Sequence, residues 1–81
     1  MEAYKQIFAS DLSEAEKIAQ AFDYVTSKIV LYAEQEIELR RAMQDRETLV
    51  KEQIKLATVQ HCRTILAEAY KMATGQEAWD A

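Results

Sequence analysis

The residues Gln44-Asp45-Arg46-Glu47-Thr48 separate two long segments of helix-forming sequence. All five side chains are polar. Asp45 and Thr48 both favour the N-cap position, where a short side-chain oxygen accepts a hydrogen bond from a free backbone amide. This stretch therefore predicts a turn between two helices. The alternative is one continuous helix, because neither Gly nor Pro interrupts the surrounding sequence.

The hydrophobic pattern before the turn favours a hairpin over a continuous rod. Alternating steps of four and three residues select one stripe: Ile18, Phe22, Val25, Ile29, Tyr32, Glu36, Leu39 and Met43. All but Glu36 are apolar or aromatic, so the stripe is a heptad seam and predicts that Phe22 and Tyr32 are core residues. From Arg46 onward the same steps meet mostly polar and small residues. A continuous coiled coil would keep its phase, and we therefore expect two antiparallel helices.

The composition agrees with an all-α fold. The 81 residues include one Gly and no Pro, and good helix formers such as Ala, Glu, Gln, Lys and Leu dominate. β-branched residues do not alternate with polar ones, as a half-buried strand requires. The length allows one small domain, residues 1–81. Its core is marginal, because a chain this short buries only about 60% of its unfolded surface.

Further signals set the ends of the helices. Ser13 and Glu16 form a capping-box pattern at a helix start, and Asp11 with Glu14 is an alternative slightly earlier. Gly75 suits the left-handed residue that ends a helix. The expected elements are a short helix, two long helices and a tail, over residues 2–9, 13–43, 47–74 and 75–81.

Both long helices carry a second apolar stripe. In helix 13–43 it consists mostly of small residues: Ala15, Ala19, Thr26, Val30, Ala33 and Ile37. Helix 47–74 has a heptad of its own: Leu49, Glu52, Leu56, Val59, Arg63, Leu66, Tyr70 and Ala73. Beside that heptad runs another stripe: Val50, Ile54, Cys62, Ile65, Ala69 and Met72. A helix in a simple hairpin needs only one apolar face, so each helix has apolar surface to spare.

The spare apolar surface predicts a homodimer. Helix 2–9, with Tyr4, Ile7 and Phe8 on one side, could dock across the open end of the hairpin but is too short to cover two stripes. We therefore expect two hairpins to pair into a four-helix-type bundle. The expected oligomer interface consists of Val50, Ile54, Cys62, Ile65, Ala69 and Met72.

The sequence supports neither an enzyme nor a cofactor site. His61 and Cys62 are the only pair that suggests chemistry, but neighbours on a helix do not face each other. One His and one Cys fall short of the four ligands of a structural zinc site, and Thr58 stands where a Glu-x-x-His motif needs Glu. A single Gly cannot build a phosphate-binding loop. We expect no catalytic residue, metal or cofactor, unless a symmetric dimer brings two copies together, and we expect Cys62 to be a small buried hydrophobic residue.

Charge and hydropathy leave another protein as the expected partner. Ten basic and 14 acidic residues give a net charge of −4, which argues against nucleic-acid binding as the main function. No apolar run approaches the roughly 20 residues of a membrane span, so we expect no membrane partner. The single Cys excludes an internal disulfide, and no signal-peptide pattern is visible. We expect a cytoplasmic protein, in the host cytoplasm if it is viral.

Four residues are candidate partner contacts: Tyr24, Arg40, Arg41 and Trp79. Tyr24 lies off the heptad. The two arginines lie in the charged region 34–55, which is either a solvated helix tip or a recognition surface for an acidic partner. Trp79 either docks on its own chain or fills a partner's pocket. We expect a non-enzymatic helical interaction module, such as an adaptor, co-chaperone or inhibitor. The alternatives are a structural subunit of a larger assembly and a small viral or mobile-element inhibitor of a host complex.

Overall fold

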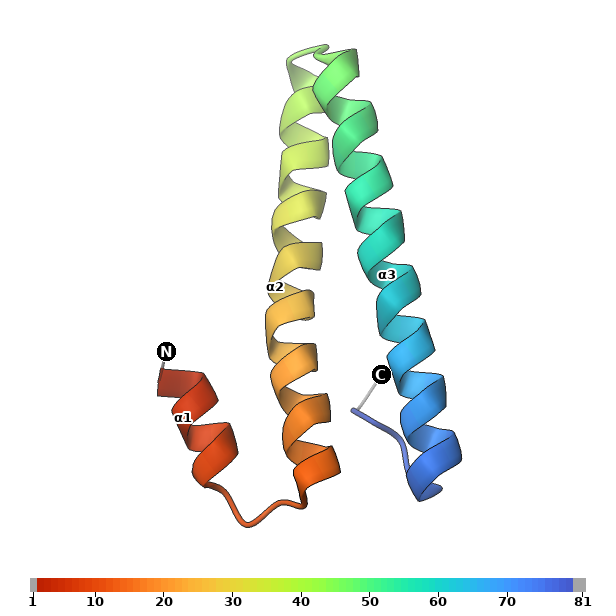
Figure 1. Ribbon diagram of the computed structural model, residues 1–81. Helices are drawn as coiled ribbons and strands as arrows, with labels where there is room; N and C mark the ends of the chain where they lie inside the picture. The colour runs from red at the N-terminus through yellow and green to blue at the C-terminus, as the bar shows by residue number, and fades with distance from the viewer. Residues whose placement is uncertain (1, 80–81) are drawn as a thin grey trace.

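The computed structural model describes residues 2–79 and contains three α-helices (Figure 1). Helix α1 (Glu2–Ala9) precedes two long antiparallel helices, α2 (Glu14–Ala42) and α3 (Arg46–Thr74). Residues 2–79 contain no strand. The predicted all-α hairpin is confirmed, and each predicted helix boundary lies within one residue of the observed one. The end of the predicted tail, residues 80–81, lies outside the described residues.

Helix α2 begins at the predicted N-cap, Ser13, and Glu16 meets the Ser13 hydroxyl in place of its backbone N–H. The Ser13 side-chain oxygen accepts a hydrogen bond from the Glu16 backbone N–H at 3.2 Å. The same hydroxyl donates to Glu16 Oε1 at 3.0 Å. Glu14 and Glu16 also place negative charge in the first turn, where it suits the helix dipole. Of the two predicted caps, the later one is observed.

The turn between α2 and α3 is held by one left-handed residue and by polar side chains. Gln44 has a φ of 58°, the conformation that reverses the chain between the two helices. Asp45 Oδ1 accepts a hydrogen bond from the Thr48 backbone N–H at 3.2 Å, and this bond lowers the pKa of Asp45. Arg40 contacts both Glu36 Oε2 at 3.1 Å and Asp45 Oδ2 at 3.5 Å. Arg40 thus ties the last turn of α2 to the cap of α3.

Helix α3 ends at Gly75, as predicted. This residue has a φ of 74°, and its N–H donates to the Lys71 carbonyl at 2.7 Å. The Thr74 hydroxyl donates to the Tyr70 carbonyl at 2.8 Å and accepts from the Gln76 N–H at 3.1 Å. These bonds turn the following residues back toward the hairpin (Figure 1).

Helix α2 packs on α3 through its small-residue stripe, not through its heptad seam. The buried residues of α2 are Ala19, Thr26, Ala33 and Ile37. The seam residues Ile18 and Tyr32 expose 60% and 61% of their surface. The prediction that Tyr32 belongs to the core is therefore wrong, and Phe22 is only half-buried.

Small side chains on α2 make room for larger ones on α3. The heptad predicted for α3 does face α2: Leu56, Val59, Arg63 and Leu66 are half-buried, and Tyr70 is buried. The separation of two packed helices depends on the side chains at their contact. Alanines opposite these larger residues let the helices approach, whereas the large seam residues of α2 would hold them apart.

The core of the hairpin is thin. Among the described residues, no large side chain is fully buried. The chain is elongated, with extents of 47 × 29 × 16 Å. Its radius of gyration is 15.4 Å, against about 12 Å for a compact chain of this length.

Helix α1 flanks α2 and does not reach α3 (Figure 1). The Tyr4 and Tyr24 rings meet edge to face, with centroids 5.5 Å apart. Phe8 remains exposed. The expectation that α1 docks across the open end of the hairpin is therefore wrong, because its aromatic contact is with the outer side of α2.

Candidate interaction surfaces

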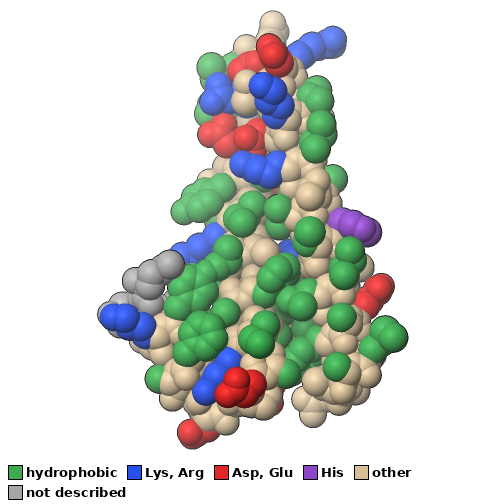
Figure 2. All heavy atoms as spheres, in the orientation of Figure 1, with side chains coloured by type: hydrophobic (Ala, Val, Ile, Leu, Met, Phe, Trp, Pro, Cys, Tyr) green, Lys and Arg blue, Asp and Glu red, His purple; other side chains and the backbone are tan. Residues whose placement is uncertain are grey.

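The exposed apolar residues of α2 and α3 point to the same side of the hairpin. In both helices the exposed stripe lies one residue before the buried one: Tyr32 precedes Ala33 in α2, and Ile65 precedes Leu66 in α3. A step of one residue rotates a side chain by about 100°, and in antiparallel helices the same offset turns both stripes toward one side. Figure 2 shows hydrophobic side chains over both helices on this side, with charged ones gathered near the turn.

We call this surface the apolar face. Its residues are Ile18, Val25, Ile29, Tyr32, Cys62, Ile65 and Ala69, and the exposed Val50, Ile54 and Met72 continue it onto the outer side of α3. Several are large and open to solvent: Ile54 exposes 61%, Ile65 53% and Met72 87% of its surface. All six residues predicted for an oligomer interface are exposed. Cys62, Ile65 and Ala69 directly precede inward-facing residues and lie on this side, whereas Val50, Ile54 and Met72 lie on the outer side of α3.

Cys62 is an exposed free thiol in the hairpin. The hairpin alone does not bury it, so its predicted burial remains a prediction about the oligomer interface. Its exposure follows from its phase on α3, because Arg63, one residue later, takes the position that faces α2.

The chain exposes more surface than a compact monomer would. Its accessible area of 6085 Å² exceeds by roughly 1,100 Å² the value of about 5,000 Å² expected for a compact protein of 9.3 kDa. The excess is similar to the roughly 800 Å² that each partner contributes to a standard protein–protein interface.

Arg63 is a charged residue in the middle of the α3 contact stripe. Its Nη2 lies 2.8 Å from Asp23 Oδ1. Its Nη1 donates to Thr26 Oγ1 at 2.6 Å and to the Asp23 carbonyl at 3.3 Å. The Thr26 hydroxyl donates in turn to the Phe22 carbonyl at 2.6 Å. One guanidinium thus links α3 to the carboxylate and the backbone carbonyl of Asp23 and to the hydroxyl of Thr26 on α2.

The tail folds back over this ion pair. Trp79 stacks on Phe22, with ring centroids 6.2 Å apart and planes 18° apart. The guanidinium carbon of Arg63 lies 4.7 Å from the centre of the indole. Glu77 contacts Lys71 Nζ at 2.9 Å and raises the pKa of that lysine. Of the two interpretations of Trp79, docking on its own chain is the one observed.

Trp79 borders two hollows on the side of the hairpin opposite the apolar face. The larger, about 590 Å³, lies between α1, α2 and the tail, and its walls include Asp23, Tyr24 and Tyr70. The smaller, about 430 Å³, is lined by α3 and includes Arg63. Ser27 and Ala67, which line these hollows, come one residue after the inward-facing Thr26 and Leu66. Residues of the apolar face come one residue before an inward-facing one, so the hollows lie on the other side of the hairpin.

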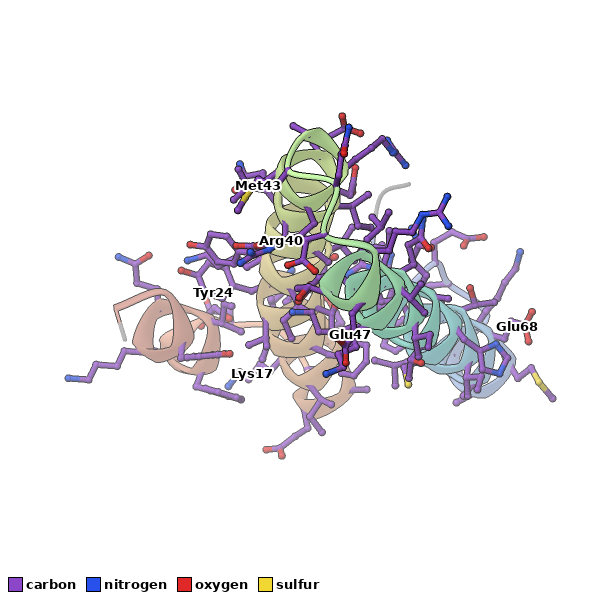
Figure 3. The ribbon with its side chains drawn as sticks, turned by 90° about the horizontal axis from the view of Figure 1, so that it is seen from above. Lys17, Tyr24, Arg40, Met43, Glu47 and Glu68 are labelled. Carbon is purple, nitrogen blue, oxygen red and sulfur yellow. The ribbon has the colours of Figure 1, made fainter. Side chains whose placement is uncertain are left out.

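Tyr24 lies between α1 and α2 (Figure 3). Lys28 Nζ donates to the Tyr24 hydroxyl at 2.7 Å and lies 4.3 Å from the ring centre. The hydrogen bond from Lys28 to Tyr24 raises the pKa of Lys28. Tyr24 thus shares the larger hollow with Trp79, and these two predicted contacts belong to one surface.

The two predicted arginine contacts lie elsewhere, at the turn. Arg40 holds the turn through its two carboxylate contacts, and Arg41 pairs with Glu38 at 2.9 Å on the outside of α2. Together with Arg46 they line a hollow of about 490 Å³. The four residues predicted to bind a partner therefore form two separate groups.

Two further findings concern metals and membranes. Within the described part of the chain, no cluster of three or more His, Cys, Asp or Glu residues could hold a metal ion. Among the helices of residues 2–79, none has the length and apolarity that a membrane span requires.

Arg63 stands in the α3 heptad, but its role was not predicted from the sequence. A charged residue at a heptad position is costly to bury without a partner, so its presence there is a signal for a polar contact across the helices. Its partners on α2 could not be predicted from the α2 heptad, because Asp23 and Thr26 lie outside that heptad.

Comparison with known proteins gives no match: the chain resembles neither a protein-family model, nor a curated protein, nor a solved structure.

Proposed function

We propose that this protein is a non-enzymatic helical interaction module that presents its apolar face to another protein chain. The packing of α2 carries this proposal. The helix turns alanines and Thr26 toward α3 and leaves larger residues such as Tyr32 outside. Burying a large apolar side chain is worth about 1.5–3 kcal/mol, so this arrangement is favourable when something covers the exposed side. Large exposed apolar side chains gathered on one side of a small protein are typical of a protein-binding site.

The partner we propose for this face is a second copy of the chain. The excess surface of roughly 1,100 Å² is close to one protomer's share of a stable interface. Two hairpins packed through their apolar faces make a four-helix-type bundle with a shared core. The same residues then meet on both sides of a two-fold axis.

Cys62 lies near the middle of this interface. Its neighbour Arg63 bonds Thr26, which is near the centre of α2, so Cys62 sits about halfway along the hairpin. A two-fold axis through the middle of the face brings the two copies of Cys62 close together. A reducing compartment such as the cytoplasm suits an exposed thiol of this kind, which is part of the same proposal.

The dimer is tested by the Ile65→Glu variant in analytical ultracentrifugation. We expect the wild-type chain to sediment as a dimer at micromolar concentration. The glutamate places two charges in the symmetric interface and weakens association at least about 100-fold. Thr64→Glu is the matched control, because Thr64 is exposed one residue earlier on α3 and lies off the apolar face.

Circular dichroism of both variants checks that the helices are retained. A wild-type chain that stays monomeric at tens of micromolar would contradict the dimer. Equal dimerisation of both variants would contradict the role of the apolar face.

A structural subunit of a larger assembly is the second candidate. The same exposed face favours it, because an unlike chain can cover apolar residues as well as a second copy can. The two candidates differ in solution, because a subunit that needs an unlike chain stays monomeric or aggregates when it is purified alone.

A further inference from the structure

The tail places its one aromatic residue in a groove that continues on both sides of it. Trp79 lines the hollow of about 590 Å³ next to Tyr24 and also the hollow of about 430 Å³ next to Arg63. The indole thus lies between the two hollows, and we call the two together the groove. A segment longer than the tail has space to lie along this groove.

The contacts of the tail show which chemistry the groove binds. The indole is held by the Phe22 ring and by the Arg63 guanidinium, whose own charge is oriented by Asp23. Two residues earlier, the Glu77 carboxylate meets Lys71 at the end of α3. The pattern is a carboxylate followed two positions later by an aromatic ring.

The tail is held by few interactions. Aromatic stacking adds about 0.5–1.5 kcal/mol to the burial of the half-exposed ring, and a cation–π contact near the surface adds about 0.5–1 kcal/mol. The ion pair of Lys71 with Glu77 is exposed, and such pairs contribute about 0–1 kcal/mol. Interactions of this size let the tail leave and return without unfolding the helices.

We propose that this groove is a docking site for a partner segment with a carboxylate two residues before an aromatic, and that the tail is its internal occupant. A partner binds only when Trp79 leaves, so the tail lowers the affinity of the site. The groove lies on the side opposite the apolar face, and the two surfaces act independently. This site brings together Tyr24 and Trp79 with Arg63.

The test uses the full chain with Trp79→Ala and a synthetic peptide of residues 74–79, Thr-Gly-Gln-Glu-Ala-Trp. Trp79 is the only tryptophan of the chain, so the indole fluorescence of the mixture comes from the peptide alone. We expect saturable binding with a shift of the emission to shorter wavelength. A dye-labelled peptide then compares this variant with the wild-type chain by fluorescence anisotropy.

We expect the labelled peptide to bind the Trp79→Ala chain about tenfold more tightly than the wild type, as follows if the tail fills the groove about 90% of the time. Glu77→Gln keeps the indole and loosens the tail, so its affinity should fall between the two. Peptides with Gln for Glu or Ala for Trp should bind more weakly.

Two results would overturn the proposal: equal affinity for the wild-type and Trp79→Ala chains, or no saturable binding to Trp79→Ala at millimolar peptide. Circular dichroism confirms that the variants keep their helices. Sedimentation of the same samples reports the dimer separately, so failure of the groove is distinguishable from failure of the apolar face.

Discussion

Arg63 joins α3 to α2 through three hydrogen bonds. Its guanidinium reaches a carboxylate, a hydroxyl and a backbone carbonyl of α2, and its flat side supports the indole of Trp79. A charge in this position is stabilising only while its partners are present, because an unpaired half-buried charge costs more than the pair contributes. Substitutions of Asp23 and Arg63 should therefore have non-additive effects on the free energy of unfolding.

Replacement of Arg63 by Met should lower the free energy of unfolding by about 1–3 kcal/mol, because Asp23 loses its charged hydrogen-bond partner. Adding Asp23→Asn to this variant should recover part of the loss, since no unpaired charge remains. Urea unfolding followed by circular dichroism, at one fixed protein concentration, measures both. Arg41→Met is the matched control, because its ion pair with Glu38 is exposed and should contribute under about 1 kcal/mol. Additive effects of the two changes at positions 23 and 63 would contradict the coupling.

Residues whose role depends on near neighbours were predictable from the sequence. Ser13, Asp45 and Gly75 each act on backbone groups three or four residues away, and each has the predicted role. Arg63 and Trp79 differ, because their contacts are with residues distant in the chain. Knowledge of which side of α2 faces α3 is needed before those contacts can be inferred.

At the scale of elements, α2 is the helix whose orientation the sequence left open. Its two stripes have the same helical period and, apart from Glu36 in the seam, differ in the size of their side chains. The seam of large residues resembles a coiled-coil contact, but the hairpin uses the small-residue stripe. In α3 the predicted heptad does face α2, since its alternative stripe is broken by polar residues such as Thr58 and His61.

Ala33→Leu tests this orientation of α2. Ala33 is 0% exposed in contact with α3, so three added carbons should separate the helices and lower the free energy of unfolding by about 1–3 kcal/mol. Gln35→Leu introduces the same side chain on the solvent side of α2 and should change stability by less than about 0.5 kcal/mol. Urea unfolding compares the two. A neutral Ala33→Leu would mean that α2 meets α3 through another stripe.

At the scale of the whole molecule, the hairpin has two surfaces with different chemistry. One side is broad and apolar, and the other is a groove that holds the tail beside polar and aromatic residues. The broad side suits a large, permanent contact, because its residues gain most from complete removal from water. The groove suits a smaller contact, because its occupant is held by a few aromatic and charged groups.

Because the core of the hairpin is thin, its stability should depend on whether the apolar face is covered. If the apolar face completes its core against a second copy, unfolding and dissociation are one process, and stability depends on protein concentration. A tenfold rise in concentration should then stabilise the folded dimer by about 1.4 kcal/mol. Thermal or urea unfolding curves recorded over two decades of concentration measure this shift. The Ile65→Glu chain should show a lower midpoint with no dependence on concentration, because its hairpin stands alone. A wild-type midpoint that stays constant over the same range would mean that the hairpin is stable without its apolar face covered by a second copy.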